Sequence, residues 1–122
     1  MSGPIGSQQW MYNASSGFYP YELNNSLKFE DGDNSYLSRT PASAGNRKTW
    51  TWSGWFKRGN IGTEYSLFSA HITNTNQTDI YLNSTDTIVF SDYQSSSKIS
   101  AQTSAVFRDT SSWYHIVVAV DT

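Results

Sequence analysis

The sequence predicts an all-β domain built as an antiparallel two-sheet sandwich, and three observations carry this prediction. Roughly eight short segments rich in β-branched and aromatic residues follow one another at intervals of about 8 to 12 residues. Clusters of Ser, Thr, Asn and Asp separate them, and no segment shows the period of a helix. With 122 residues and 16% aromatic side chains, the chain has the size of one domain and large rings to fill its core.

Residues 1–25 show no regular period, yet they are too aromatic for an idle tail. Glycines and prolines interrupt the segment, and its large rings are those of Trp10, Tyr12, Phe18, Tyr19 and Tyr21. Such a segment usually lies against another surface. It is either an arm that covers the sheet of its own domain or an arm that anchors the domain to a neighbouring subunit. We expect the sandwich itself to occupy residues 26–122.

Residues 26–40 predict a β-hairpin. Leu27 and Phe29 alternate in SLKFE, the turn sequence DGDN follows, and SYLSRT forms the second half. Asp31 and Asp33 also have the spacing that begins a calcium loop, but the remaining ligands of such a loop, including its terminal Glu, are missing. We therefore expect ordinary turn chemistry and no metal, and these two aspartates are only weak calcium candidates.

The segment Thr49–Arg58, TWTWSGWFKR, is the most aromatic part of the chain and predicts a central strand. At a period of two, Trp50, Trp52 and Phe56 share one face, while Trp55 lies on the other. Aromatic and β-branched residues favour a packed, pleated surface. We expect the face that carries Trp50 to line the core of the sandwich.

The later segments predict the remaining strands. EYSLFSAHI is partly apolar on both faces, Asp79–Leu82 and Thr87–Phe90 form a second hairpin, and Lys98–Thr103 is polar enough for a sheet edge. The last segment, Trp113–Asp121, is apolar on both faces, so we expect a central strand next to the tryptophan strand. Its core face would carry Ile116, Val118 and Val120, packed against the tryptophan strand's core face.

Three side chains remain as candidates for contact with a carbohydrate or a neighbouring subunit. Trp55 faces away from the predicted core, and Trp113 and His115 share its side if the first and last long strands pair. An indole can stack on a sugar ring while its N–H forms a hydrogen bond. Subunit interfaces are also enriched in Trp and Tyr. Such a cluster is more often the second packed face of a fully buried strand, or a subunit interface, than a sugar platform.

Charge and targeting signals exclude several classes. A net charge of -2 and a pI near 5.5 do not supply the basic field that nucleic-acid binding needs. The chain has no cysteine, so it forms no disulfide and no thiolate metal site. No secretory signal pattern and no membrane-spanning run is visible. We expect synthesis in a cytoplasm, without a nucleic-acid or membrane partner.

No arrangement of residues predicts catalysis or a cofactor. A glucanase needs two carboxylates across the scissile bond, and the glutamates are only Glu22, Glu30 and Glu64, without a Glu-x-Asp-x-Glu strand. A serine nucleophile needs a histidine base, and only His71 and His115 are present. His115 is most simply a hydrogen-bonded structural residue. We therefore expect a protein that is not an enzyme and that carries no metal.

Four stretches together resemble the laminin-G-like, concanavalin-A-like jelly-roll family. They are SLKFEDGDNSYLSRT, KTWTWSGWFKRG, a strand with SLFSA, and SSWYHIVVAVDT, and they span Ser26–Thr122. The most specific parts are Trp55 with Lys57 and Trp113 with His115. The resemblance implies a jelly-roll sandwich with an extended N-terminal arm.

More narrowly, MSGPIGSQQWMY and TWTWSGWFKRGN resemble virion proteins of tailed bacteriophages. This resemblance implies a non-enzymatic structural protein, in a tail fibre or a capsid decoration, that assembles in the host cytoplasm and resides in the virion. Residues 1–25 would then anchor it to other virion proteins of the capsid or tail. Homo-oligomers are expected, with a trimer favoured by analogy with phage fibres.

The resemblance also implies an unfinished sheet and an alternative function. Family members usually continue past the strand that WYHIVVAVD resembles, so we expect an abbreviated sandwich or one that another chain completes. Its open edge would accept a strand from a partner. The alternative function is a lectin-like module that binds host surface glycans through Trp55 and its neighbours.

Overall fold

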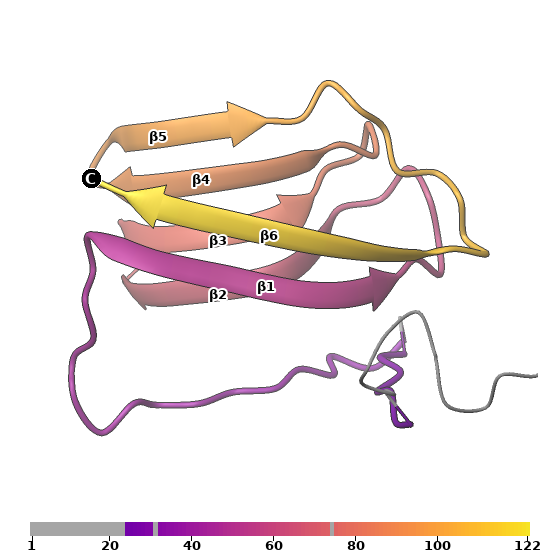
Figure 1. The fold of residues 1–122 in the computed structure, drawn as a ribbon, viewed down its shortest axis with the longest axis horizontal. Coiled ribbons are helices and arrows are strands. Elements are labelled where there is room, and N and C mark those ends of the chain that lie inside the picture. Colours follow the sequence, from indigo (N-terminus) through magenta and orange to yellow (C-terminus); the bar gives the residue numbers. More distant parts are fainter. Residues whose placement is uncertain (1–23, 31, 74) are drawn as a thin grey trace, which may run out of the picture. The chain divides into compact units, whose positions relative to one another are not determined.

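The structure is a computed structural model that describes residues 24–30, 32–73 and 75–122. The chain divides into two units, Met1–Ala44 and Gly45–Thr122, and each is considered by itself. Every regular element of the described residues is a β-strand, and all of them lie in the second unit (Figure 1). The all-β prediction is therefore confirmed.

Six strands form two antiparallel sheets. The strands are β1 (Thr49–Lys57), β2 (Tyr65–Thr73), β3 (Asn76–Leu82), β4 (Ile88–Gln94), β5 (Ser97–Gln102) and β6 (Trp113–Asp121). β2, β3, β4 and β5 follow one another as a meander in a four-stranded sheet, while β1 pairs with β6 in a two-stranded sheet. Figure 1 shows the two-stranded sheet stacked on the four-stranded one. The two antiparallel sheets agree with the predicted sandwich.

The pairing of β1 with β6 confirms that the tryptophan strand and the last strand are neighbours. In their register Trp50 lies opposite Val120, Trp52 opposite Val118, and Trp55 opposite His115. The prediction that both strands are central is wrong, because each has only one partner strand among the described residues. The prediction was wrong because the outward faces of both strands carry large apolar residues, and a strand that is buried on both faces has the same sequence pattern.

The core lies between the two sheets. Ile80, Leu82 and Ile88 are buried at its centre, and the half-buried rings and aliphatic side chains of β1 and β6 pack against them. The Trp50 ring lies 6.2 Å from that of Phe68 and 6.0 Å from that of Phe90. The prediction that Trp50, Trp52 and Phe56 face the core is confirmed. Ile116 and Val118 face it too, but from the same sheet rather than from the opposite one.

Gly54 interrupts the aromatic face of β1 for a steric reason. A Cβ atom placed on it would lie 2.9 Å from the indole ring of Trp52. The missing side chain therefore makes room for the Trp52 ring, which lies over the backbone of its own strand. Close packing of this kind leaves no space for one further methyl group.

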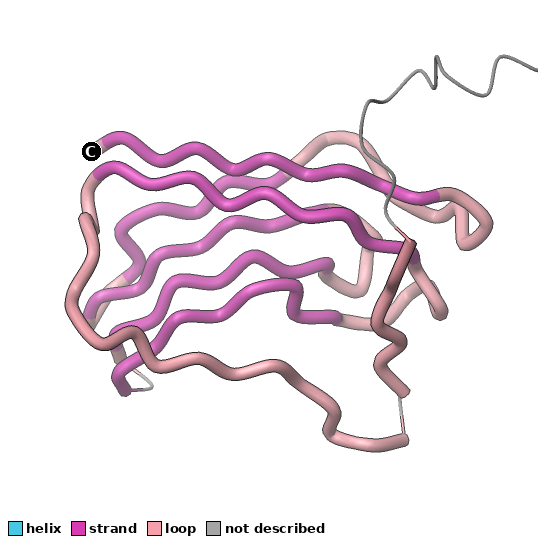
Figure 2. Tube along the Cα trace, turned by 60° about the horizontal axis from the view of Figure 1, so that its bottom comes forward, coloured by secondary structure: helices cyan, strands magenta, loops and turns pink. Residues whose placement is uncertain are grey.

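Two local predictions are confirmed and one is wrong. β3 pairs with β4 across the predicted second turn, and β5 is an edge strand of its sheet. Within residues 24–30 and 32–44, however, there is no strand, and only a turn at 32–34 remains of the predicted hairpin (Figure 2). Leu27 is 68% exposed and Tyr36 79% exposed. An alternating pattern forms a stable strand only where other strands pair with it, and no described residue of the first unit belongs to a strand.

Candidate functional site

The outward face of the two-stranded sheet brings the three predicted contact residues together. Trp55 lies opposite His115, and Trp113 lies opposite Lys57. The rings of Trp55 and His115 stack with centroids 4.7 Å apart and an interplanar angle of 22°. The Oγ of Ser53 and the Nε2 of His115 are 2.9 Å apart and share a hydrogen bond. We call Ser53, Trp55, Trp113 and His115 the outer aromatic cluster.

The outer aromatic cluster offers apolar surface and fixed polar groups. Trp55 is 49% exposed and Trp113 52% exposed, so both rings remain open to a partner. The hydrogen bond to Ser53 and the stack on Trp55 hold the imidazole of His115 in one orientation. A planar aromatic surface beside hydrogen-bonding groups suits a sugar ring or a protein side chain.

Ser53 was not among the contact residues predicted from the sequence. The signal was present, because Ser53 lies two residues before Trp55 and therefore on the same face of the strand. In the β1–β6 register Ser53 lies opposite Val117, which makes it a diagonal neighbour of His115. A serine bonded to a histidine meets one requirement of a nucleophilic site. No carboxylate contacts His115 among the described residues, so this pair lacks the third, orienting group.

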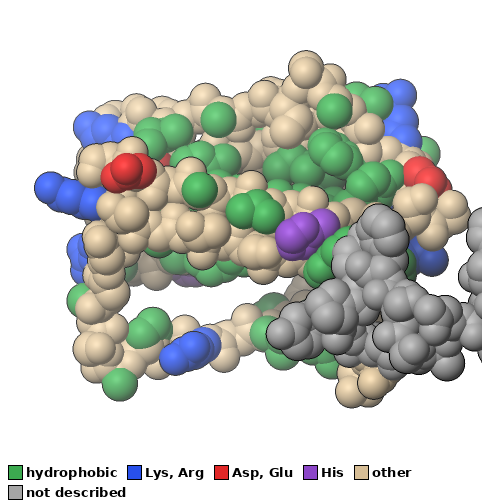
Figure 3. All heavy atoms as spheres, viewed as in Figure 1, with side chains coloured by type: hydrophobic (Ala, Val, Ile, Leu, Met, Phe, Trp, Pro, Cys, Tyr) green, Lys and Arg blue, Asp and Glu red, His purple; other side chains and the backbone are tan. Residues whose placement is uncertain are grey.

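An apolar groove opens beside β6. It has a volume of about 550 Å³, and its floor and walls include Ile88, Phe90, Phe107, Ile116 and Val118. Figure 3 shows hydrophobic side chains gathered between β5 and β6. The groove exists because two strands cover a sheet of four, so that the inner face of β4 and β5 extends past β6.

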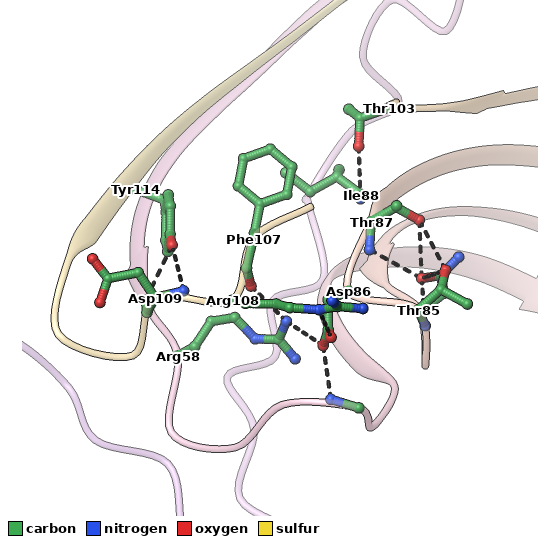
Figure 4. Close-up of polar contacts among 12 residues, drawn as sticks. Arg58, Thr85, Asp86, Thr87, Ile88, Thr103, Phe107, Arg108, Asp109 and Tyr114 are labelled. Carbon is green, nitrogen blue, oxygen red and sulfur yellow. Dashed lines mark hydrogen bonds and ion pairs between the residues drawn. The ribbon is translucent and has the colours of Figure 1, made fainter. Parts of the chain in front are cut away.

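A buried carboxylate ties three loops together at one end of the sandwich (Figure 4). Asp86 accepts hydrogen bonds from Nη1 of Arg58 at 2.6 Å, from Nε of Arg108 at 2.9 Å, and from the backbone N–H of Gly62 at 2.7 Å. The backbone oxygen of Asp86 also accepts the N–H of Phe107 at 2.8 Å. These residues lie in the β1–β2, β3–β4 and β5–β6 connections. We call this group the Asp86 clamp.

The Asp86 clamp stabilises the charged form of its carboxyl group. The N–H of Gly62, followed by Arg108 and Arg58, lowers the pKa of Asp86 from 3.8 to about 2 against the opposing effect of burial. Asp86 itself has a φ of 65°, a conformation that a residue with a side chain seldom adopts. Its ion pairs and hydrogen bonds offset that local strain.

The guanidinium of Arg58 is only partly satisfied. Its Nη1 also donates to the backbone oxygen of Phe107 at 2.7 Å, and its side chain is 1% exposed. Within the described part of the chain, its Nε and Nη2 have no hydrogen-bond partner. The ion pair with Asp86 offsets part of the desolvation cost of burying this guanidinium. The two nitrogens without a partner add to that cost.

A second polar cluster orders the loop before β6. Asp109 accepts hydrogen bonds from Ser111 and Ser112, which lower its pKa from 3.8 to about 2. The hydroxyl of Tyr114 donates to the backbone oxygen of Asp109 at 3.1 Å and accepts its N–H at 3.0 Å. The ring of Tyr114 stacks on Phe56 and meets Phe107 edge to face. The start of β6 is thus held by polar and aromatic contacts together.

The remaining predicted site residues fall partly outside the structure. Trp10, Tyr12, Phe18, Tyr19, Tyr21 and Asp31 all lie outside the described residues. Asp33 belongs to the turn at 32–34, where its backbone N–H donates to the oxygen of Glu30 at 3.3 Å. No group of three or more His, Asp or Glu residues able to hold a metal ion occurs in the described ranges.

Comparison with known proteins adds no relative. No family model matches the chain, and neither a curated protein nor a solved structure matches it.

Proposed function

We propose that this chain is a non-enzymatic structural protein of a bacteriophage virion, as a tail-fibre or capsid-decoration component. In this proposal a concanavalin-A-like jelly roll is the folded module, and residues 1–25 are the arm that anchors it to capsid or tail proteins. The sequence resemblance to virion proteins of tailed phages supports the proposal. The apolar surface of the sandwich supports it independently.

That surface is the observation that carries the proposal. The two-stranded sheet leaves both of its edges unpaired among the described residues, and its outward face exposes Trp55, Trp113 and Val117 to 49%, 52% and 57%. Open strand edges and exposed apolar groups promote aggregation in a protein that stays monomeric in solution. In a subunit that is surrounded by other proteins, the same edges and apolar groups can form the contacts between subunits.

The proposal is tested by locating the chain in a particle. Phage particles purified on a density gradient from infected cells are digested and searched by mass spectrometry for peptides of this chain, and an antibody against residues 45–122 labels intact particles in the electron microscope. We expect the peptides to co-purify with particles and the antibody to label capsid or tail. Absence from washed particles, with the protein recovered only in the soluble lysate, would contradict the proposal.

Oligomeric state is a second test of the same proposal. A fibre or decoration component is expected to be a homo-oligomer, with a trimer favoured. Light scattering on the purified chain should give a mass of about three times 13.7 kDa. A monomer at all concentrations would argue against a trimeric fibre.

The outer aromatic cluster favours a second candidate function, the recognition of host surface glycans. The free face of the Trp55 ring can stack on a sugar, and Ser53 and His115 can hydrogen-bond to its hydroxyl groups. Binding on a glycan array that Trp55→Ala abolishes would support it. Val117→Ala is the matched control, because Val117 is exposed on the same face. Equal binding by the wild-type chain and Trp55→Ala would exclude the cluster as a glycan site.

A further inference from the structure

The free edge of β6 exposes a regular row of backbone groups. The N–H of Thr122 donates to the oxygen of Lys48 at 3.0 Å, and this bond sets the alternation along the β1–β6 pair. Even-numbered residues of β6 therefore bond to β1, while the N–H and C=O groups of the odd-numbered residues point away from it. The side chains of His115, Val117 and Ala119 belong to the outward face, yet all three residues line the groove. This is consistent with their backbone groups pointing towards it.

The floor of the groove is the uncovered inner face of β4 and β5. Ile88 and Phe90 of β4 and Ala101 of β5 lie there, and Phe107 also lines the groove. The groove lining contains no Asp, Glu, Lys or Arg side chain. The groove thus combines an apolar floor with a wall of hydrogen-bonding backbone, and this combination matches one extended strand.

We propose that this groove binds a single extended strand from another polypeptide, which pairs with β6 in the antiparallel direction and covers the inner face of β4 and β5. Both sheets of the molecule are antiparallel, so this direction continues the existing pattern. The strand carries uncharged apolar side chains at alternate positions, because the groove lining offers no countercharge. Six to seven of its residues match the lengths of β5 and β4.

A second copy of this chain does not fit through its own β6. Pairing β6 with β6 of another copy would place the second sandwich where β4 and β5 of the first extend past β6 (Figure 1). The four-stranded sheets of the two copies would then occupy the same space. A strand without a sheet beneath it meets no such obstacle, and this steric difference favours a donated segment over a symmetric dimer.

This inference rests on the proposed function, because a neighbouring virion subunit is the source of such a strand. The two are separable by experiment. If the chain is found in particles but its groove takes no strand, the proposed function stands and this inference is wrong. If the groove binds a strand but the chain is absent from particles, this inference stands and the proposed function is wrong.

The test uses the full chain, isotopically labelled, and the peptide acetyl-Lys-Thr-Val-Thr-Val-Thr-Val-Thr-Lys-amide. NMR titration should shift the amide signals of His115, Val117 and Ala119 and the side-chain signals of Phe90 and Ile88. In an antiparallel pair the outward-facing threonines present their N–H groups to β6. A peptide N-methylated at its threonines should therefore lose binding at least tenfold, while one N-methylated at its valines should keep it.

Two protein variants complete the test. Val117→Pro removes an N–H that points to the free edge and leaves the β1–β6 bonds in place, since proline is tolerated on edge strands. It should fold and bind the peptide at least tenfold more weakly, while Val117→Ala should bind as the wild type does. Equal binding by the two methylated peptides, or no shift at β6, would overturn the proposal even if Val117→Pro fails to fold. Concentration-dependent self-association that shifts the same amides would assign the groove to a second copy and overturn it too.

Discussion

The end of the sandwich that holds Asp86 and the side along β6 differ in whether their polar groups have hydrogen-bond partners within the chain. At the end, one carboxylate joins three connections through charge-assisted bonds from Arg58, Arg108 and Gly62. Along β6, a strand of nine residues leaves its outer edge without a partner among the described residues and borders an apolar groove. The polar groups at the end are paired within the chain, while the outer edge of β6 has no partner strand in the part of the chain that the structure describes. Variants at the two regions should therefore differ in what they change.

The largest expected effect is at the Asp86 clamp. Arg58→Met keeps most of the side-chain volume and removes one of the two arginines from Asp86. Breaking a buried ion pair costs about 3–5 kcal/mol when the remaining charge is left uncompensated, and this is the upper bound here because Arg108 and the Gly62 N–H still bond to Asp86. Chemical denaturation should show this loss in the free energy of unfolding. The neighbouring Lys57→Met, at an exposed position, should change it by no more than about 0.5 kcal/mol. Equal effects of the two substitutions would refute the special role of the clamp.

Gly54 tests the close packing on the core face of β1. Gly54→Ala would place a Cβ atom 2.9 Å from the Trp52 ring and should lower the free energy of unfolding by about 1–3 kcal/mol, the usual range for overpacking. Gly59→Ala is the control, because nothing lies within 4 Å of the Cβ built there. A neutral Gly54→Ala would mean that the Trp52 ring can move without cost.

Acid should weaken the polar end selectively. The pKa values of Asp86 and Asp109 are about 2 in the folded chain and 3.8 in model peptides, so the unfolded chain takes up protons first as the pH falls. Their contribution is complete above the unfolded value and is lost as the pH falls from about 4 towards 2. We expect Tm to drop over this range. Asp109→Asn should have a lower Tm at about pH 6 but a smaller drop on acidification, and an unchanged drop would contradict this origin.

The smallest expected effect is on the outward face. Trp55→Ala removes the stack on His115 from an exposed surface and should cost about 1 kcal/mol or less. Urea denaturation measures this cost, with Val117→Ala as the reference. A loss as large as that of Arg58→Met would show that the outer aromatic cluster belongs to the fold rather than to a binding surface.

Local pattern predicted most of the strands and part of the site. The alternation of Trp50, Trp52 and Phe56 placed them correctly in the core, and the shared face of Trp55 and His115 followed once their strands paired. The predicted hairpin at residues 26–40 has the same kind of alternation but no strand. The Asp86 clamp was not predicted, because its members are separated by 22 and 28 residues and no local pattern joins them.

The sequence by itself determined the strand class, most strand boundaries and which face of each strand is apolar. These properties depend on neighbouring residues and on the two-residue period of an extended backbone. Only the tertiary structure decided which strands are edges, where the groove opens, and that Asp86 meets Arg58 and Arg108. Those properties depend on contacts between distant segments, and the same apolar strand face is core or open surface according to whether a second sheet covers it.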